Sequence, residues 1–122
     1  MEILNNLEIV EELNKVKNLS KKDLLEKLFL LEKIGCTNRQ IISIIKCNPI
    51  YLERCIEDIF NLIKILLKLG FRSLNILFDA NPFILNLDSF QIKDYIDEKL
   101  KSEKLEDIVD ELDSNPYLFQ EI

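Results

Sequence analysis

The segments CNPIYL at 47–52, ANPFIL at 80–85 and SNPYLF at 114–119 contain every proline of this 122-residue chain. In each segment an asparagine precedes the proline and mostly apolar residues follow it. Pro49, Pro82 and Pro116 lie 33 and 34 residues apart, a spacing that is typical of repeat proteins. The sequence therefore predicts a chain built from repeated units.

A short amphipathic stretch precedes each Asn-Pro pair: QIISIIK from 40, LNILFDA from 74 and EDIVDEL from 106. Asparagine is a favoured N-cap, and proline is favoured at the first helical position because it lacks an N–H group. Proline also disfavours α conformation in the residue before it. We therefore expect each Asn-Pro pair to end one short helix and to start the next helical turn, with the asparagine as its N-cap.

A longer helix is expected upstream of each short one. When Gly35 is aligned on Gly70, the preceding apolar residues superpose at helical spacing. Both glycines then lie just past a helix end, where a positive φ is commonly required. The superposed residues are Leu24, Leu25, Leu28, Leu31 and Ile34 on Ile59, Phe60, Ile63, Leu66 and Leu69.

Polar residues mark the expected helix starts. SKKD at 20–23 and TNRQ at 37–40 have the spacing of capping boxes. Ser73 and Ser102 are expected to cap the later short helices.

The composition agrees with an all-α fold. Two glycines and three prolines in 122 residues leave few positions for turns, and 48% apolar content is sufficient for a core. We predict a right- or left-handed α-solenoid that forms a single domain over 1–122. Residues 1–19 are expected to form an N-terminal capping helix, followed by repeats at 20–52, 53–86 and 87–122. The third repeat is degenerate because no glycine occurs between Leu100 and Leu105.

The predicted core contains one or more apolar residues from every long helix, short helix and Asn-Pro segment of the first two units. Only the two helices contribute in the third unit. The core positions are Leu28, Ile45, Leu52, Ile63, Leu66, Leu77, Leu85, Ile96 and Leu112.

The stretches LEKIGCTNRQIISIIKCNPIYL and LLKLGFRSLNILFDANPFIL resemble the repeats of the mitochondrial transcription termination factor (mTERF) family. The resemblance covers about 20–120 and is weaker in the third unit. It implies a left-handed α-solenoid whose concave face often binds double-stranded DNA or structured RNA, sometimes with a protein partner. The matching positions are structural ones, namely Gly35, Gly70, the three prolines and the apolar residues Leu52, Leu85 and Phe119. The chain is much shorter than the usual member.

Two other folds are compatible with the pattern. A tetratricopeptide-like or HEAT-like helix pair has a similar repeat length, although tetratricopeptide units favour tryptophan and this chain has none. An ordinary helical bundle would leave the Asn-Pro period as a coincidence.

The residue content argues against an enzyme. Histidine is absent, which removes the commonest acid–base residue near neutral pH and the commonest metal ligand. Two isolated glycines cannot form a phosphate-binding loop. We predict no catalytic residue, no metal site, no cofactor and no small-molecule substrate.

The location is expected to be cytoplasmic, without membrane contact. No apolar stretch reaches the roughly 20 residues of a membrane span, and the first residues do not resemble a signal peptide. Cys36, Cys47 and Cys55 form no CxxC pair. They are expected to behave as reduced, small apolar residues.

Charge is unevenly distributed along the chain, whose net charge is −6. Residues 1–14 hold four acids and no base, and residues 15–72 hold 12 bases and six acids. Residues 73–122 reverse the balance, with four bases and 12 acids. A polyanion that followed the repeats would be attracted first and repelled later.

Two functional hypotheses follow from this charge distribution. In the first, the basic 15–72 segment binds the backbone of double-stranded DNA or structured RNA. Its candidate contacts are Arg39, Lys46, Arg54, Lys64, Lys68 and Arg72. In the second, the chain is a protein-interaction adaptor whose third unit binds a basic protein partner through Glu106, Asp110 and Asp113.

Overall fold

The structure, a computed structural model, describes residues 20–122, so the capping helix expected in 1–19 lies outside the described residues. Over 20–122 the chain forms helices joined by short turns and contains no strand, which confirms the all-α prediction. With η denoting a 3-10 helix, the elements are α2 (Lys21–Lys33), α3 (Asn38–Cys47), η2 (Pro49–Glu53), α4 (Ile56–Leu69), α5 (Leu74–Ala80), η3 (Pro82–Asn86), α6 (Ser89–Lys99), α7 (Leu105–Ser114) and η4 (Pro116–Glu121).

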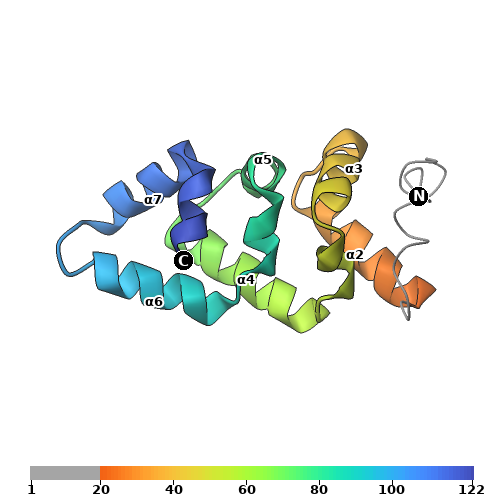
Figure 1. Cartoon of the computed structure of the whole chain (residues 1–122), viewed down its shortest axis with the longest axis horizontal. Coiled ribbons are helices and arrows are strands. Elements are labelled where there is room, and N and C mark those ends of the chain that lie inside the picture. Colours follow the sequence, from red (N-terminus) through yellow and green to blue (C-terminus); the bar gives the residue numbers. More distant parts are fainter. Residues whose placement is uncertain (1–19) are drawn as a thin grey trace.

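One order of elements occurs three times: a longer α-helix, a second α-helix and a 3-10 helix that starts at a proline. We refer to residues 20–52, 53–86 and 87–122 as units 1, 2 and 3. Figure 1 shows them side by side along the longest axis of the molecule, with α2, α4 and α6 along one edge and α3, α5 and α7 along the other. Like elements of adjacent units touch, since α4 packs on α6, and α3 on α5.

The two glycines end the long helices of units 1 and 2 in the same way. Gly35 and Gly70 have φ of 104° and 111°, in the left-handed region that favours glycine. After each glycine, the next residue donates its N–H five residues back, from Cys36 to Leu31 and from Phe71 to Leu66. This is the Schellman arrangement, and it turns the chain sharply into the short helix.

The helix starts agree only in part with the sequence. Thr37 forms the predicted reciprocal capping box with Gln40, whereas Ser20 accepts a hydrogen bond from the N–H of Asp23 without the return bond of a box. Ser73 precedes α5 but its side chain makes no capping bond. The prediction for Ser102 is wrong, because α7 begins after Lys104. The chain between α6 and α7 closes instead through main-chain bonds such as Ser102 N–H to the Lys99 carbonyl.

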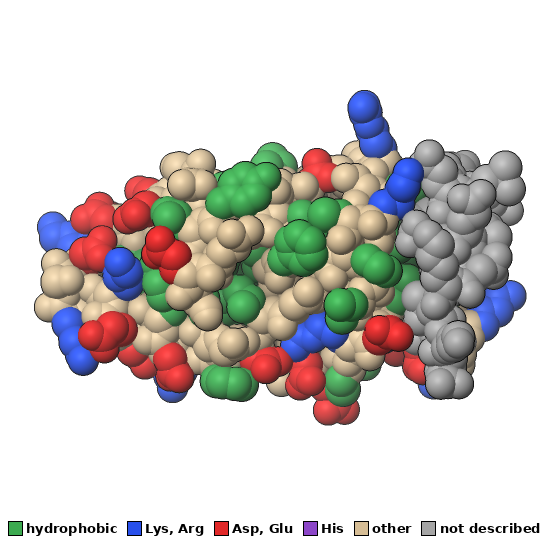
Figure 2. Space-filling view, in the orientation of Figure 1, with side chains coloured by type: hydrophobic (Ala, Val, Ile, Leu, Met, Phe, Trp, Pro, Cys, Tyr) green, Lys and Arg blue, Asp and Glu red, His purple; other side chains and the backbone are tan. Residues whose placement is uncertain are grey.

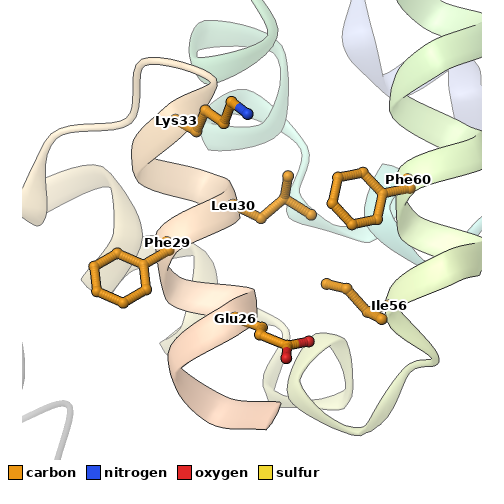
Figure 3. Close-up of a pocket in the computed structure, with 6 residues that line it drawn as sticks. All are labelled: Glu26, Phe29, Leu30, Lys33, Ile56 and Phe60. Atoms are coloured by element: carbon orange, nitrogen blue, oxygen red, sulfur yellow. The ribbon is translucent and has the colours of Figure 1, made fainter. Parts of the chain in front are cut away.

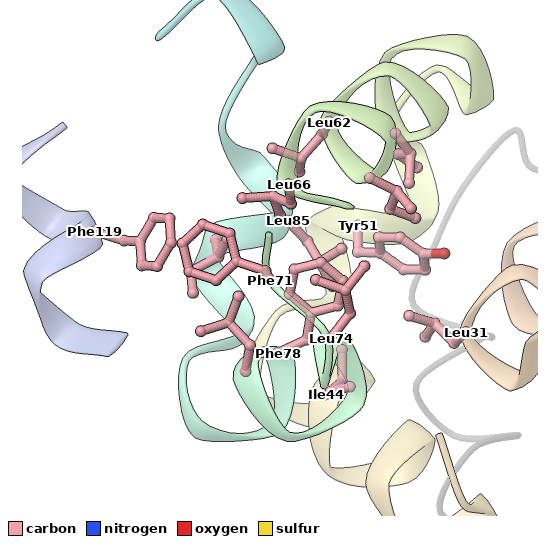
Figure 4. Packing of buried hydrophobic residues seen from close by; sticks show 14 of the residues in the cluster. Leu31, Ile44, Tyr51, Leu62, Leu66, Phe71, Leu74, Phe78, Leu85 and Phe119 are labelled. Carbon is pink, nitrogen blue, oxygen red and sulfur yellow. The ribbon is translucent and has the colours of Figure 1, made fainter. Parts of the chain in front are cut away.

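The core runs continuously through the three units (Figure 4). In Figure 4 the rings of Phe71 and Phe119 meet between units 2 and 3, with centroids 5.8 Å apart. One stripe residue differs from the prediction, since the side chain of Phe60 is 44% exposed. All predicted core residues are buried, namely Leu28, Ile45, Leu52, Ile63, Leu66, Leu77, Leu85, Ile96 and Leu112.

The Asn-Pro pairs have a role that the sequence did not reveal. Pro49, Pro82 and Pro116 start the 3-10 helices as expected, but only Asn81 caps with its side chain, by accepting from the N–H of Phe83. Asn48 and Asn115 occupy the N-cap positions as predicted, but their side chains make no capping bond.

The asparagine amides instead connect adjacent units. Asn48 donates to the Pro82 carbonyl at 3.0 Å, and Asn81 donates to the Pro116 carbonyl at 3.0 Å. Asn48 also exchanges hydrogen bonds with the side-chain amide of Asn86. Asn48 and Asn81 are only 1% and 2% exposed, so water cannot readily replace these bonds.

Substituting Gly70 tests its conformational role. Gly70→Val is expected to lower the free energy of unfolding by about 1–3 kcal/mol, because a β-branched residue resists the left-handed region. A Cβ at this position would meet no atom within 4 Å, so the loss would come from the backbone alone. The measurement is urea unfolding, and Gly70→Asn is the control that should lose less, because asparagine tolerates this region better. Equal stability of the wild type and both variants would contradict the assignment.

Removing the asparagine amides tests the connection between units. Asn81→Ala is expected to lose about 1–3 kcal/mol of unfolding free energy, because the partly buried Pro116 carbonyl would lose its donor and the N–H of Phe83 would lose its acceptor. Asn115→Ala is the matched control. The Asn115 side chain is exposed and makes no hydrogen bond within residues 20–122, so its loss should stay within about 0.5 kcal/mol. Similar losses in the two variants would show that the amide donation does not hold the units together.

Candidate nucleic-acid interface

Five of the six predicted basic contacts lie on the surface. Arg39 and Lys46 are exposed on α3, Lys64 and Lys68 are exposed on α4, and Arg72 is exposed in the turn between α4 and α5. These residues come from units 1 and 2. Each of them is therefore accessible to a ligand.

Arg54 is the exception, because its guanidinium is used inside the protein. It donates to the carbonyls of Leu85 and Leu87 and pairs with the Asp88 carboxylate at 2.6 Å. Its side chain is only 12% exposed. Arg54 joins the end of η2 to the segment between η3 and α6, so its guanidinium is less accessible to a ligand than the other five.

Lys27 is a second cation of the basic segment that is not available to a ligand. Its side chain is buried, and its Nζ donates to the Leu52 carbonyl. Burial lowers the pKa of Lys27 from its ordinary value, with nearby carboxylates such as Asp23 opposing the shift. Lys27 and the adjacent Tyr51, whose hydroxyl donates to the Lys27 carbonyl at 2.7 Å, fasten η2 to α2.

A hollow of about 340 Å³ between α2 and α4 brings Lys64 and Arg72 together. Lys33 of α2 lines the same hollow, although the sequence did not single it out. No carboxylate of residues 20–122 forms an ion pair with any of these three cations. A usable signal for Lys33 was present, because the Gly35-to-Gly70 alignment places it in the same column as Lys68.

The three predicted acidic contacts are brought together on the exposed side of α7. Glu106, Asp110 and Asp113 line a second hollow, of about 490 Å³, with Arg72 and Ser73 on its opposite wall. Arg72 therefore lies between the basic hollow and the acidic one. The acids of unit 3 oppose an anion that approaches Arg72 from this side.

The units form a charge gradient along the molecule. Unit 1 carries six Lys and Arg against three Asp and Glu, unit 2 carries four of each, and unit 3 carries four against eleven. Figure 2 shows acidic side chains crowding the end of the visible face formed by α6 and α7. By this balance a polyanion is favoured on unit 1, whose net charge is positive, and disfavoured on unit 3.

The cysteines differ from each other in exposure. Cys36 is buried, and burial raises the pKa of its thiol to about 12, which suppresses the nucleophilic thiolate. Cys47 and Cys55 are exposed, so the expectation of small apolar packing residues is correct only for Cys36.

Residues 20–122 contain no group of three or more Cys, Asp or Glu arranged to hold a metal ion. Within that range, no helix is both long enough and apolar enough to cross a membrane.

Comparison with known protein families, with curated proteins and with solved structures gives no match to this chain.

The structural role of Arg54 can be tested by stability. Arg54→Met is expected to lose about 1.5–3 kcal/mol of unfolding free energy, because hydrogen bonds from a charged group to partly buried acceptors disappear. Lys64→Met is the control and should change the stability by no more than about 0.5 kcal/mol, since its ammonium is exposed. Urea unfolding monitored by circular dichroism measures both. If Arg54→Met were as stable as Lys64→Met, Arg54 would return to the set of possible ligand contacts.

Proposed function

We propose that this protein is a non-enzymatic helical-repeat module that binds the backbone of double-stranded DNA or structured RNA. The observation that carries the proposal is the convergence of Lys33, Lys64 and Arg72 on one hollow without ion-pair partners among residues 20–122. Exposed cations without partners are available to phosphate groups. Arg39, Lys46 and Lys68 extend the proposed surface along α3 and α4.

The repeat architecture supports this proposal. The 3-10 helices start at prolines 33 and 34 residues apart, the asparagines that bond to the next unit are 33 residues apart, and the glycine turns at Gly35 and Gly70 are 35 residues apart. We therefore propose an α-solenoid, right- or left-handed, with repeats like those of the mTERF family. Stacked repeats provide an extended surface that matches a long polymer better than a small molecule.

The charge gradient gives the proposed binding a direction. Phosphates would contact units 1 and 2, where each neutralised phosphate releases condensed counterions. The acids on α7 border Arg72 and would repel phosphates beyond it. Contacts of this kind recognise the backbone and carry no base preference by themselves.

A second candidate function is a protein-interaction adaptor. The clustering of Glu106, Asp110 and Asp113 along one hollow favours it, because a basic protein segment would be complementary to these acids. The acidic balance of unit 3 also favours a basic protein partner over a polyanion.

Salt titration and charge reversal separate these functions. Fluorescence anisotropy would measure binding of the full chain to a mixed-sequence DNA duplex and to an RNA hairpin from about 50 mM to 200 mM salt. We expect a log–log slope of about −0.9 per phosphate contact for the duplex. The double variant Lys64→Glu, Arg72→Glu should abolish binding, whereas neutralising Glu106, Asp110 and Asp113 to their amides should tighten it.

The control for net charge is Lys93→Glu together with Lys104→Glu, which makes the same charge change on unit 3. It should weaken binding much less than the Lys64 and Arg72 variant. An equal effect would mean that net charge alone governs binding. No binding to DNA or RNA at about 50 mM salt would favour the adaptor.

A further inference from the structure

An apolar groove separates α2 from α4 on the surface. Two adjoining hollows of about 270 and 340 Å³ share Leu30, Lys33 and Phe60 as lining residues. Figure 3 shows Leu30 of α2 facing Phe60 and Ile56 of α4 across the gap, and Phe29 of α2 also lines the smaller hollow. Ile34 and Leu67 continue the apolar lining at the other end of the groove.

Two large apolar side chains that line the groove are exposed to solvent. Phe60 is 44% exposed and Leu67 is 52% exposed, both on α4. Their positions i and i+7 place them on one side of the helix, two turns apart. Contiguous exposed apolar surface of this kind marks an interaction site more often than isolated apolar residues do.

The charges around the groove are mainly positive. Lys33, Lys64 and Arg72 border it, against one carboxylate, Glu26. A nucleic-acid backbone would satisfy these cations but would leave the floor of Leu30, Ile56 and Phe60 without an apolar partner. A helix with an apolar stripe and acidic flanks would satisfy both the floor and the rim.

We propose that the groove between α2 and α4 binds an amphipathic α-helix of a partner protein whose apolar stripe is flanked by Asp and Glu. α2 and α4 have 13 and 14 residues, and are therefore about 20 Å long. A partner helix of about four turns matches this length and places residues at i, i+3 or i+4 and i+7 on the apolar floor. This site does not rest on the nucleic-acid proposal, although it shares Lys33, Lys64 and Arg72 with it, so the peptide helix and a nucleic acid would compete for these cations. It differs from the acidic adaptor surface on α7.

The experiment titrates the full chain with a fluorescent synthetic peptide of about 16 residues. The peptide has leucines at helical i, i+3, i+4 and i+7 spacing and glutamates beside them. A scrambled peptide of the same composition and a peptide with lysines in place of the glutamates are the comparisons. We expect saturable binding of the first peptide and binding of the other two that is about tenfold weaker or more. Equal binding of all three would overturn the proposal.

Protein variants locate the binding. Two variants should each lower the affinity for the peptide about tenfold or more. They are the single variant Phe60→Ser and the double variant Lys33→Glu, Lys64→Glu. Phe83→Ser is the matched control, because Phe83 is 49% exposed on η3 and lies outside both hollows. It should leave the peptide affinity unchanged, and circular dichroism should show that every variant is folded.

Unchanged binding in Phe60→Ser, or an equal loss in Phe83→Ser, would overturn the assignment. The assignment would also be overturned if the wild type did not bind the peptide and Phe60→Ser lost binding to the DNA duplex. The groove would then be assigned to nucleic acid. The peptide titration contains no nucleic acid. Failure of the nucleic-acid proposal therefore leaves this result interpretable.

Discussion

The hydrogen bonds from buried asparagine amides to the proline carbonyls of the next unit are the constraint on which this fold depends. Asn48 reaches Pro82, and Asn81 reaches Pro116, each at 3.0 Å. Apolar packing is not directional and tolerates small sliding movements between helices, whereas a buried amide that loses its acceptor is penalised. The amides therefore fix the spacing and orientation of successive units. The shape of any surface that extends over two units, such as the α2–α4 groove, therefore depends on these hydrogen bonds.

The same requirement for satisfied polar groups decides which cations are available. Arg54 and Lys27 bind main-chain carbonyls, with Arg54 spanning from the end of η2 to the start of α6. Carbonyls at the ends of short helices need donors, and a long basic side chain can supply one from a neighbouring element. As a result, fewer cations of the basic 15–72 segment are available to a ligand than the sequence contains.

The surface divides into three chemically different areas. Lys33, Lys64 and Arg72, which form no ion pair within residues 20–122, lie on units 1 and 2, carboxylates gather on α7, and exposed apolar residues line the groove between α2 and α4. Arg72 borders the basic hollow and the acidic one, so a ligand on either side changes the electrostatic potential at the other. This proximity links the two candidate functions, because a basic partner on α7 would reduce the repulsion of an anion near Arg72.

The sequence alone determined the helical class, the turns at Gly35 and Gly70, the 3-10 starts at the prolines and the buried apolar positions. These features depend on local backbone preferences and on the 3.6-residue periodicity, which act within a few residues and can be recognised in one chain. It also indicated five exposed basic positions, but not that Lys33 accompanies them, nor that Ser102 fails to cap.

Only the tertiary structure decided that Asn48 bonds to the next unit, that Arg54 is withdrawn from the surface and that Phe60 is left exposed. Each outcome depends on partners 31 to 38 residues away, or on the gap left between two helices. Local pattern contains no information on such distances, because the hydrogen-bond partner of a side chain is set by how whole helices pack.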